Sequence, residues 1–62
     1  MYQDRLRAVI AERRVRQCQI AKGTGMNPAL LNRKLHGHVE FKVPELKAVC
    51  DYLGIKMDDL EE

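Results

Sequence analysis

Apolar residues recur along this chain at three- and four-residue steps, which is the spacing of amphipathic helices rather than of strands. The first such segment carries Leu6, Val9 and Ile10 among good helix formers. β-branched runs are scarce and helix formers are abundant, so the pattern predicts an all-α fold.

Glycine, asparagine and proline residues mark where the predicted helices end and begin. Gly25 and Gly37 each follow a short apolar segment and suit the left-handed residue that ends a helix. Asn27 is a strong N-cap residue, and Pro28 suits the first helical position, where its missing N–H costs nothing. We therefore expect one domain over residues 1–62 with five short helices, at about 2–14, 17–24, 28–36, 44–53 and 57–61.

The same spacing predicts which side chains face the core. Ile20 and Ala21 of the second helix and the pair Leu31 and Leu35 of the third are expected to be buried, with Cys18 partly buried. In the C-terminal part the expected core positions are Leu46, Val49, Cys50, Leu53 and Leu60. Leu30 and Lys34 are placed at the margins of the outward face of the third helix.

Length and composition exclude several classes of protein. A chain of 62 residues leaves no room for a cleft between two lobes, and we find no nucleophile with a neighbouring base, no phosphate loop and no paired catalytic carboxylates. We therefore expect no catalytic residues and no enzyme. No apolar run approaches the roughly 18 residues of a membrane span, so we expect a cytoplasmic protein.

The cysteines and histidines do not form a metal-binding pattern. Cys18, Cys50, His36 and His38 supply neither C-x-x-C nor H-x-x-x-H, whereas a structural zinc site needs four ligands at suitable spacing. We expect no metal, no cofactor and no small-molecule ligand.

Charge is distributed unevenly along the chain. Residues 1–37 hold eight Lys and Arg against two Asp and Glu, a net of +6, whereas residues 38–62 hold three against seven, a net of −4. The basic half indicates an anionic partner, and its arginines favour phosphate, whose oxygens match the guanidinium fork. The other interpretation is a solvated surface with an acidic tail.

Residues 17–37 combine two short helices with a glycine-containing turn, which is the arrangement of a helix-turn-helix motif. In that motif the first helix crosses the DNA backbone and the second lies in the major groove. The outer face of the second helix stays bare for DNA, so a closely packed first helix must support it.

The segment resembles the lambda-repressor-like (Cro-type) helix-turn-helix family. The residues that carry this resemblance are Gln17, Ala21, Gly25, Met26, Asn27, Leu31 and Gly37. The segment 41–60 is similar to the family's fourth and fifth helices, so the resemblance extends over nearly the whole chain.

This resemblance implies a sequence-specific double-stranded DNA-binding regulator, of the phage or plasmid repressor type, that binds a near-palindromic operator as a homodimer. The implied base contacts are Pro28, Ala29, Asn32 and Arg33. The implied backbone contacts are Gln17, Asn27, Arg16, Lys22, His36, His38 and Lys42. Arg33 can pair bidentately with guanine and Asn32 with adenine.

The implied dimer interface comprises the loop after the third helix and the C-terminal region, namely His38, Val39, Glu40, Phe41, Ile55, Met57 and Leu60. These residues could instead close the core. Because so short a C-terminal segment brings little interface, we expect dimerisation to be weak without DNA.

The sequence departs from the family at several places. Gly23 and Thr24 replace a helix former and an aliphatic residue, so we expect the end of the second helix to fray. Arg16 stands where Ser, Thr or Asn usually caps the second helix, and Ile10 and Leu35 stand where many relatives keep a buried ion pair. The alternative function is a protein-interaction module, such as an antitoxin or adaptor, that docks through the acidic C-terminal segment with Met57 and Leu60.

Overall fold

The computed structural model describes residues 2–60, which form four α-helices and one 3-10 helix and contain no strand. The elements are α1 (Tyr2–Arg13), α2 (Gln17–Thr24), α3 (Pro28–Leu35), α4 (Val43–Leu53) and η1 (Met57–Leu60). The all-α prediction is confirmed. The prediction of five helices is corrected, because the last element is a single turn of 3-10 helix.

A short 3-10 turn is what this last segment can support. Gly54 ends α4 in the left-handed conformation with φ 73°, and among the described residues after it the four of η1 are helical. The backbone N–H of Lys56 donates to Asp59 Oδ2 at 3.1 Å, which closes the turn at its start. Such short segments commonly adopt 3-10 geometry. Residue 61, the end of the predicted fifth helix, lies outside the described residues.

The other boundaries agree with the predictions within one residue. α1 ends at Arg13 because Arg14 adopts a positive φ of 55°, and the N–H of Arg14 then donates to the carbonyl of Ala11 at 3.1 Å. α4 begins at Val43 rather than at residue 44, since Lys42 takes the extended N-cap conformation. α3 ends at Leu35, with His36 as its C-cap.

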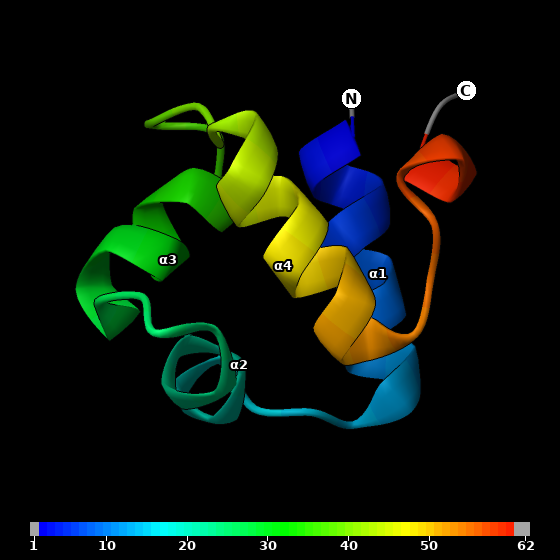
Figure 1. Cartoon of the computed structure of the whole chain (residues 1–62), viewed down its shortest axis with the longest axis horizontal. Helices are drawn as coiled ribbons and strands as arrows, with labels where there is room; N and C mark the ends of the chain where they lie inside the picture. Colours follow the sequence, from blue (N-terminus) through cyan, green and yellow to red (C-terminus); the bar gives the residue numbers. More distant parts are fainter. Residues whose placement is uncertain (1, 61–62) are drawn as a thin grey trace.

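α4 lies in the middle of the molecule (Figure 1) and contacts α1, α2 and η1. α2 and α3 pack against each other and occupy the side of the molecule away from η1 (Figure 1). α1 contacts α3, α4 and η1, so it closes the bundle from behind α4 in this view.

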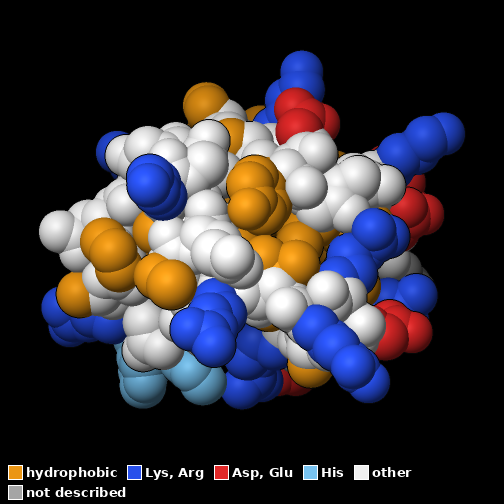
Figure 2. All heavy atoms as spheres, turned by 90° about the horizontal axis from the view of Figure 1, so that it is seen from below, with side chains coloured by type: hydrophobic (Ala, Val, Ile, Leu, Met, Phe, Trp, Pro, Cys, Tyr) orange, Lys and Arg blue, Asp and Glu red, His pale blue; other side chains and the backbone are white. Residues whose placement is uncertain are grey.

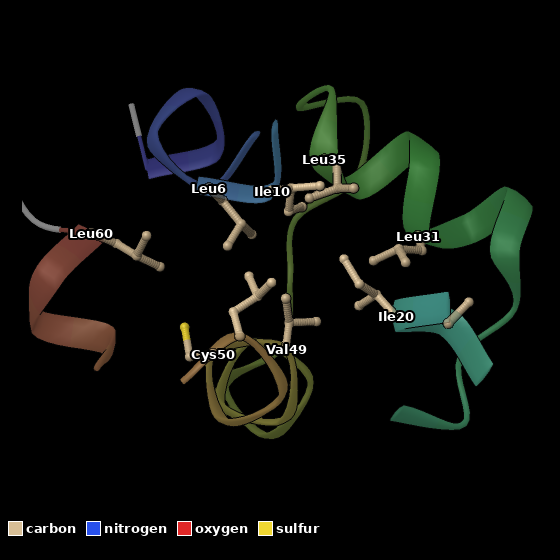
Figure 3. Close-up of a cluster of buried hydrophobic side chains, with 10 residues drawn as sticks. Leu6, Ile10, Ile20, Leu31, Leu35, Val49, Cys50 and Leu60 are labelled. Atoms are coloured by element: carbon tan, nitrogen blue, oxygen red, sulfur yellow. The ribbon is translucent and has the colours of Figure 1, made fainter. Parts of the chain in front are cut away.

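A single apolar core joins all five elements, and its side chains point toward a common centre (Figure 3). It consists of Leu6, Ile10, Ile20, Ala21, Leu31, Leu35, Val49, Cys50, Leu53 and Leu60. The predicted core positions are thus confirmed except Leu46, which is partly buried and packs against the core. Burial raises the pKa of the Cys50 thiol, since the charged thiolate is disfavoured away from water.

Two predictions of burial near the surface were wrong. Cys18 is exposed rather than partly buried, because the second position of α2 faces outward while Ile20 and Ala21 face the core. Lys34 is 3% exposed and therefore inside the fold rather than at its margin.

Candidate nucleic-acid interface

The turn between α2 and α3 is fixed by backbone hydrogen bonds and one side-chain cap. Gly25 has φ 74°, a left-handed conformation in which its N–H donates to the carbonyl of Ala21. Asn27 Oδ1 accepts from the N–H of Ala29 at 2.9 Å and from that of Leu30 at 3.3 Å. The start of α3 is thus capped.

α3 separates its side chains into an inner and an outer face. Leu31 and Leu35 are fully buried. The predicted base contacts Pro28, Ala29, Asn32 and Arg33 are all exposed. Their spacing places them on one side of the helix, so the structure brings these four residues together on a face that other molecules can reach.

The start of α2 is linked to the middle of α3 by a hydrogen bond between two predicted DNA contacts. Asn32 Nδ2 donates to Gln17 Oε1 at 2.9 Å. This leaves the Oδ1 atom and one Nδ2 proton of Asn32, and the amide protons of Gln17, for a further partner. The bond fixes the two amide side chains relative to each other.

Basic and imidazole side chains surround the exposed face of α3. The predicted backbone contacts Arg16, Lys22, Asn27, His36, His38 and Lys42 are exposed, and Gln17 is half-buried. On the side of the molecule where α2 lies, Lys and Arg predominate over Asp and Glu, and His side chains adjoin them at one edge (Figure 2). Such a face attracts polyanions.

The C-terminal end of α3 is tied to α1 through Arg7. Arg7 Nη1 lies 3.3 Å from His36 Nδ1, and since a guanidinium only donates, this imidazole nitrogen accepts. Arg7 Nη2 also forms an ion pair with Asp4. The hydrogen bond and the positive charge of Arg7 hold the pKa of Asp4 below its ordinary value.

Lys34 is a residue of this region that sequence reasoning misplaced. Its ammonium forms an ion pair with Glu45 at the start of α4. The pattern contained a signal for its burial, because Lys34 lies three residues after Leu31 and one before Leu35, on the inner face of the helix. A positive charge at that position requires an acidic partner, and the spacing alone did not indicate which one.

Gly23 is a second residue whose role depends on a distant contact. A Cβ atom built at Gly23 would lie 2.4 Å from Cε2 of Tyr52, so the Tyr52 ring of α4 packs directly on the glycine backbone of α2. The absence of a side chain at residue 23 gives the Tyr52 ring room to lie against α2.

The predicted dimer-interface residues do not form one patch. Leu60 is 3% exposed and belongs to the core, while Phe41, Ile55 and Met57 are partly buried against it. His38 and Glu40 are exposed and Val39 is half-buried. In Figure 1 the loop of residues 36–42 and η1 lie at opposite sides of the molecule, with α1 and α4 between them.

Neither a metal centre nor a membrane segment is found in residues 2–60. No three His, Cys, Asp or Glu side chains among them come close enough to hold a metal ion. No helix in the same range has the length and apolar character needed to cross a membrane.

Comparison with known proteins identifies the family. Searches of curated proteins and of solved structures returned no match to this chain. The family model of the Cro/C1-type HTH DNA-binding domain matches residues 5–62. This match extends from within α1 to η1 and includes the α2–turn–α3 unit with its exposed outer face. The chain therefore belongs to the Cro/C1-type helix-turn-helix DNA-binding domains, a family that is typically not enzymatic.

Proposed function

We propose that this protein is a transcriptional regulator of the repressor type that binds a specific DNA sequence with α3 in the major groove. The observation that carries the proposal is the outer face of α3, where Ala29, Asn32 and Arg33 are exposed together in a chain of this family. The major groove is about 12 Å wide and admits one α-helix.

The side chains on that face have the chemistry that base recognition needs. Arg33 offers a bidentate donor pair to the O6 and N7 atoms of guanine. Asn32 keeps an acceptor and a donor for adenine, and its hydrogen bond to Gln17 fixes its position beforehand. Ala29 can contact a thymine methyl group. Pro28 brings no hydrogen-bond donor, so we expect DNA shape to contribute to specificity.

Phosphate contacts come from residues around α3. Gln17 and Asn27 stand at the starts of α2 and α3, while Arg16, Lys22, His36, His38 and Lys42 contribute charge or donors at the edges of the same face. Each phosphate that a cation neutralises releases counterions, so affinity falls as salt concentration rises.

A near-palindromic operator and a homodimer complete the proposal. Two copies bound about one helical turn apart would each read one half-site. The interface that we propose uses the exposed loop residues His38 and Glu40 with Val39, because Leu60 is buried in the core. Since this surface is small, we expect the dimer to form mainly on DNA.

The experiment is a selection of bound sequences from random duplex DNA at two salt concentrations, with the wild type, Arg33→Ala and Arg5→Ala. We expect a palindromic sequence with a guanine preference that Arg33→Ala loses. Arg5→Ala removes the same charge from an exposed position in the first turns of α1, at the opposite end of that helix from α2 (Figure 1), so it should keep the preference.

The possible outcomes distinguish a DNA-binding regulator from a protein-interaction module. Enrichment of a sequence by the wild type supports a DNA-binding regulator. No enrichment above non-specific binding, even at low salt, would contradict it and would direct attention to a protein partner such as a toxin.

A further inference from the structure

Lys34 is a positive charge enclosed by the fold directly behind the exposed face of α3. Two polar or charged side chains are buried in the described part of the chain, Gln3 and Lys34, and Lys34 is 3% exposed. Removing an ammonium from water is costly unless an anion compensates it. An apolar side chain could fill this position without that cost, so the presence of a charge needs another explanation.

The compensating anion is Glu45, which serves two partners at once. Glu45 Oε1 forms the ion pair with Lys34 and also accepts the backbone N–H of Lys42 at 3.0 Å. The first contact reaches α3 and the second caps the start of α4. One carboxylate thus connects the C-terminal part of α3 to Lys42, the residue proposed to bind a phosphate.

Two aromatic rings, those of Phe41 and Tyr2, lie beside the Lys34–Glu45 ion pair and the segment that precedes Lys42. Lys34 Nζ lies 6.0 Å from the centre of the Phe41 ring, and the Phe41 and Tyr2 rings are 6.3 Å apart. The backbone N–H of Phe41 donates to the Tyr2 hydroxyl at 3.4 Å. The chain that leads into Lys42 is therefore held from α1, from α3 and from α4.

We propose that Lys34 is a positioning residue for DNA binding: through Glu45 it holds Lys42 and the start of α4 in a fixed place relative to the outer face of α3. Base contacts and phosphate contacts can then engage one DNA site together. A prearranged interface loses less conformational entropy on binding, so this raises affinity although Lys34 does not touch DNA. The inference rests on the proposed function.

A purely structural role is the alternative that the experiment must separate. Removing one partner of a buried ion pair destabilises a protein chiefly when the remaining charge stays buried. Lys34→Met keeps much of the side-chain volume and removes the buried charge, while the Glu45 side chain that remains is 26% exposed and still accepts the Lys42 N–H. Folding is therefore expected to survive, as judged by circular dichroism and thermal melting. DNA affinity distinguishes the roles, because only a positioning role predicts a loss in a folded variant.

The experiment is a binding titration on the selected operator, with Lys42→Ala introduced into both the wild type and Lys34→Met. We expect Lys34→Met to weaken binding by about tenfold, the upper part of the range for residues that act through others. We also expect Lys42→Ala to cost much less in Lys34→Met than in the wild type, because Lys42 is then no longer held in place. Lys34→Arg, which keeps the charge, should retain most of the affinity.

Two further variants complete the design. Lys47→Met removes one positive charge from an exposed position of α4 and should leave the effect of Lys42→Ala unchanged. Glu45→Gln removes the ion pair but keeps an oxygen for the Lys42 N–H. Measured at a temperature at which circular dichroism shows it to be folded, it should weaken binding as Lys34→Met does.

The failure of this inference differs from the failure of the proposed function. A wild type that selects no DNA sequence contradicts both. A wild type that binds its operator, with a folded Lys34→Met or Glu45→Gln that binds equally well and keeps the full cost of Lys42→Ala, overturns the positioning role alone.

Discussion

α2 and α4 are built in the same way at both ends, yet only in α4 does the side chain that accepts the N-cap N–H also form an ion pair with another helix. Each begins after a basic residue, Arg16 or Lys42, whose side chain makes no cap. In each, a side chain three residues later accepts the N–H of that residue, Gln19 at 3.1 Å and Glu45 at 3.0 Å. Both end in a left-handed glycine, with φ 74° and 73°.

The two starts differ in the charge of the side chain that accepts the N-cap N–H. The start of α2 is joined to α3 by a separate neutral hydrogen bond, from Asn32 to Gln17. Gln19 is neutral and exposed, and it supports α2 locally. Glu45 makes the same local bond and, in addition, compensates the buried ammonium of Lys34. The same backbone need is thus met once by local structure and once by a contact that also fixes α4 against α3.

Replacing Glu45 by Gln turns the start of α4 into a copy of the start of α2, and we expect the largest stability effect from it. The amide oxygen can still accept the Lys42 N–H, but the buried Lys34 loses its anion, which is strongly unfavourable. The melting temperature at neutral pH should fall by more than about 10 °C for a domain of this size. Thermal melting followed by circular dichroism measures it.

Acid pH should remove the stability difference between the wild type and Glu45→Gln, because it neutralises the Glu45 carboxylate in the wild type. The hydrogen bonds from Lys34 and from the Lys42 N–H hold the pKa of Glu45 below its ordinary value of 4.5. Because this pKa is lowered by folding, the stabilisation is complete above about pH 4.5 and is lost as pH falls toward the folded-state pKa. The melting temperatures of the wild type and Glu45→Gln should therefore converge in acid. The effect of Asp4 is common to both proteins, and a gap that persists at low pH would contradict the assignment.

The ends of the helices and their buried faces could be predicted from sequence, whereas the contacts between helices could not. Gly25, Asn27 and Gly37 act through the backbone of their own turn, so their residue types were enough to place the ends of α2 and α3. The separation of buried Leu31 and Leu35 from exposed Arg33 likewise follows from helical spacing alone.

The features that could not be predicted depend on contacts between residues that are far apart in sequence. Lys34 is buried because Glu45 lies eleven residues later, in a different helix. Gly23 is explained by Tyr52 of α4, and Leu60 by a core that four other elements complete. The exposed face of α3 could thus be predicted, while the contacts that hold it from behind could not.

The C-terminal ends of α2 and α4 offer the second test, through Gly23 and Tyr52. Alanine at residue 23 would favour a helix by about 0.8–1.0 kcal/mol, but its Cβ would collide with the Tyr52 ring. We therefore expect Gly23→Ala to bring no net gain in the wild type. In Tyr52→Ala the collision is absent, and Gly23→Ala should stabilise the protein by about 1 kcal/mol. Chemical denaturation of the four proteins measures this coupling.

An equal effect of Gly23→Ala in both backgrounds would show that Tyr52 does not restrict residue 23 in solution. Tyr52→Phe is the matched control, because it keeps the ring and removes only the hydroxyl. It should behave as the wild type does toward Gly23→Ala.

The smallest effect is expected from the reciprocal exchange at the start of α2, Gln19→Glu. The carboxylate keeps the bond to the Arg16 N–H and adds a negative charge near the helix N-terminus, which favours folding by about 0.3–1 kcal/mol. Unlike Glu45, the new carboxylate has no buried ammonium to pair with, so the gain in stability should stay within this range.

DNA binding of Gln19→Glu should weaken, and more at low salt, because the new charge stands beside Arg16 on the proposed phosphate-binding side. Lys56→Gln, which changes the net charge equally from an exposed position between α4 and η1, should weaken binding less. Equal losses in the two variants would mean that net charge, rather than the position of α2 on the DNA backbone, sets the affinity.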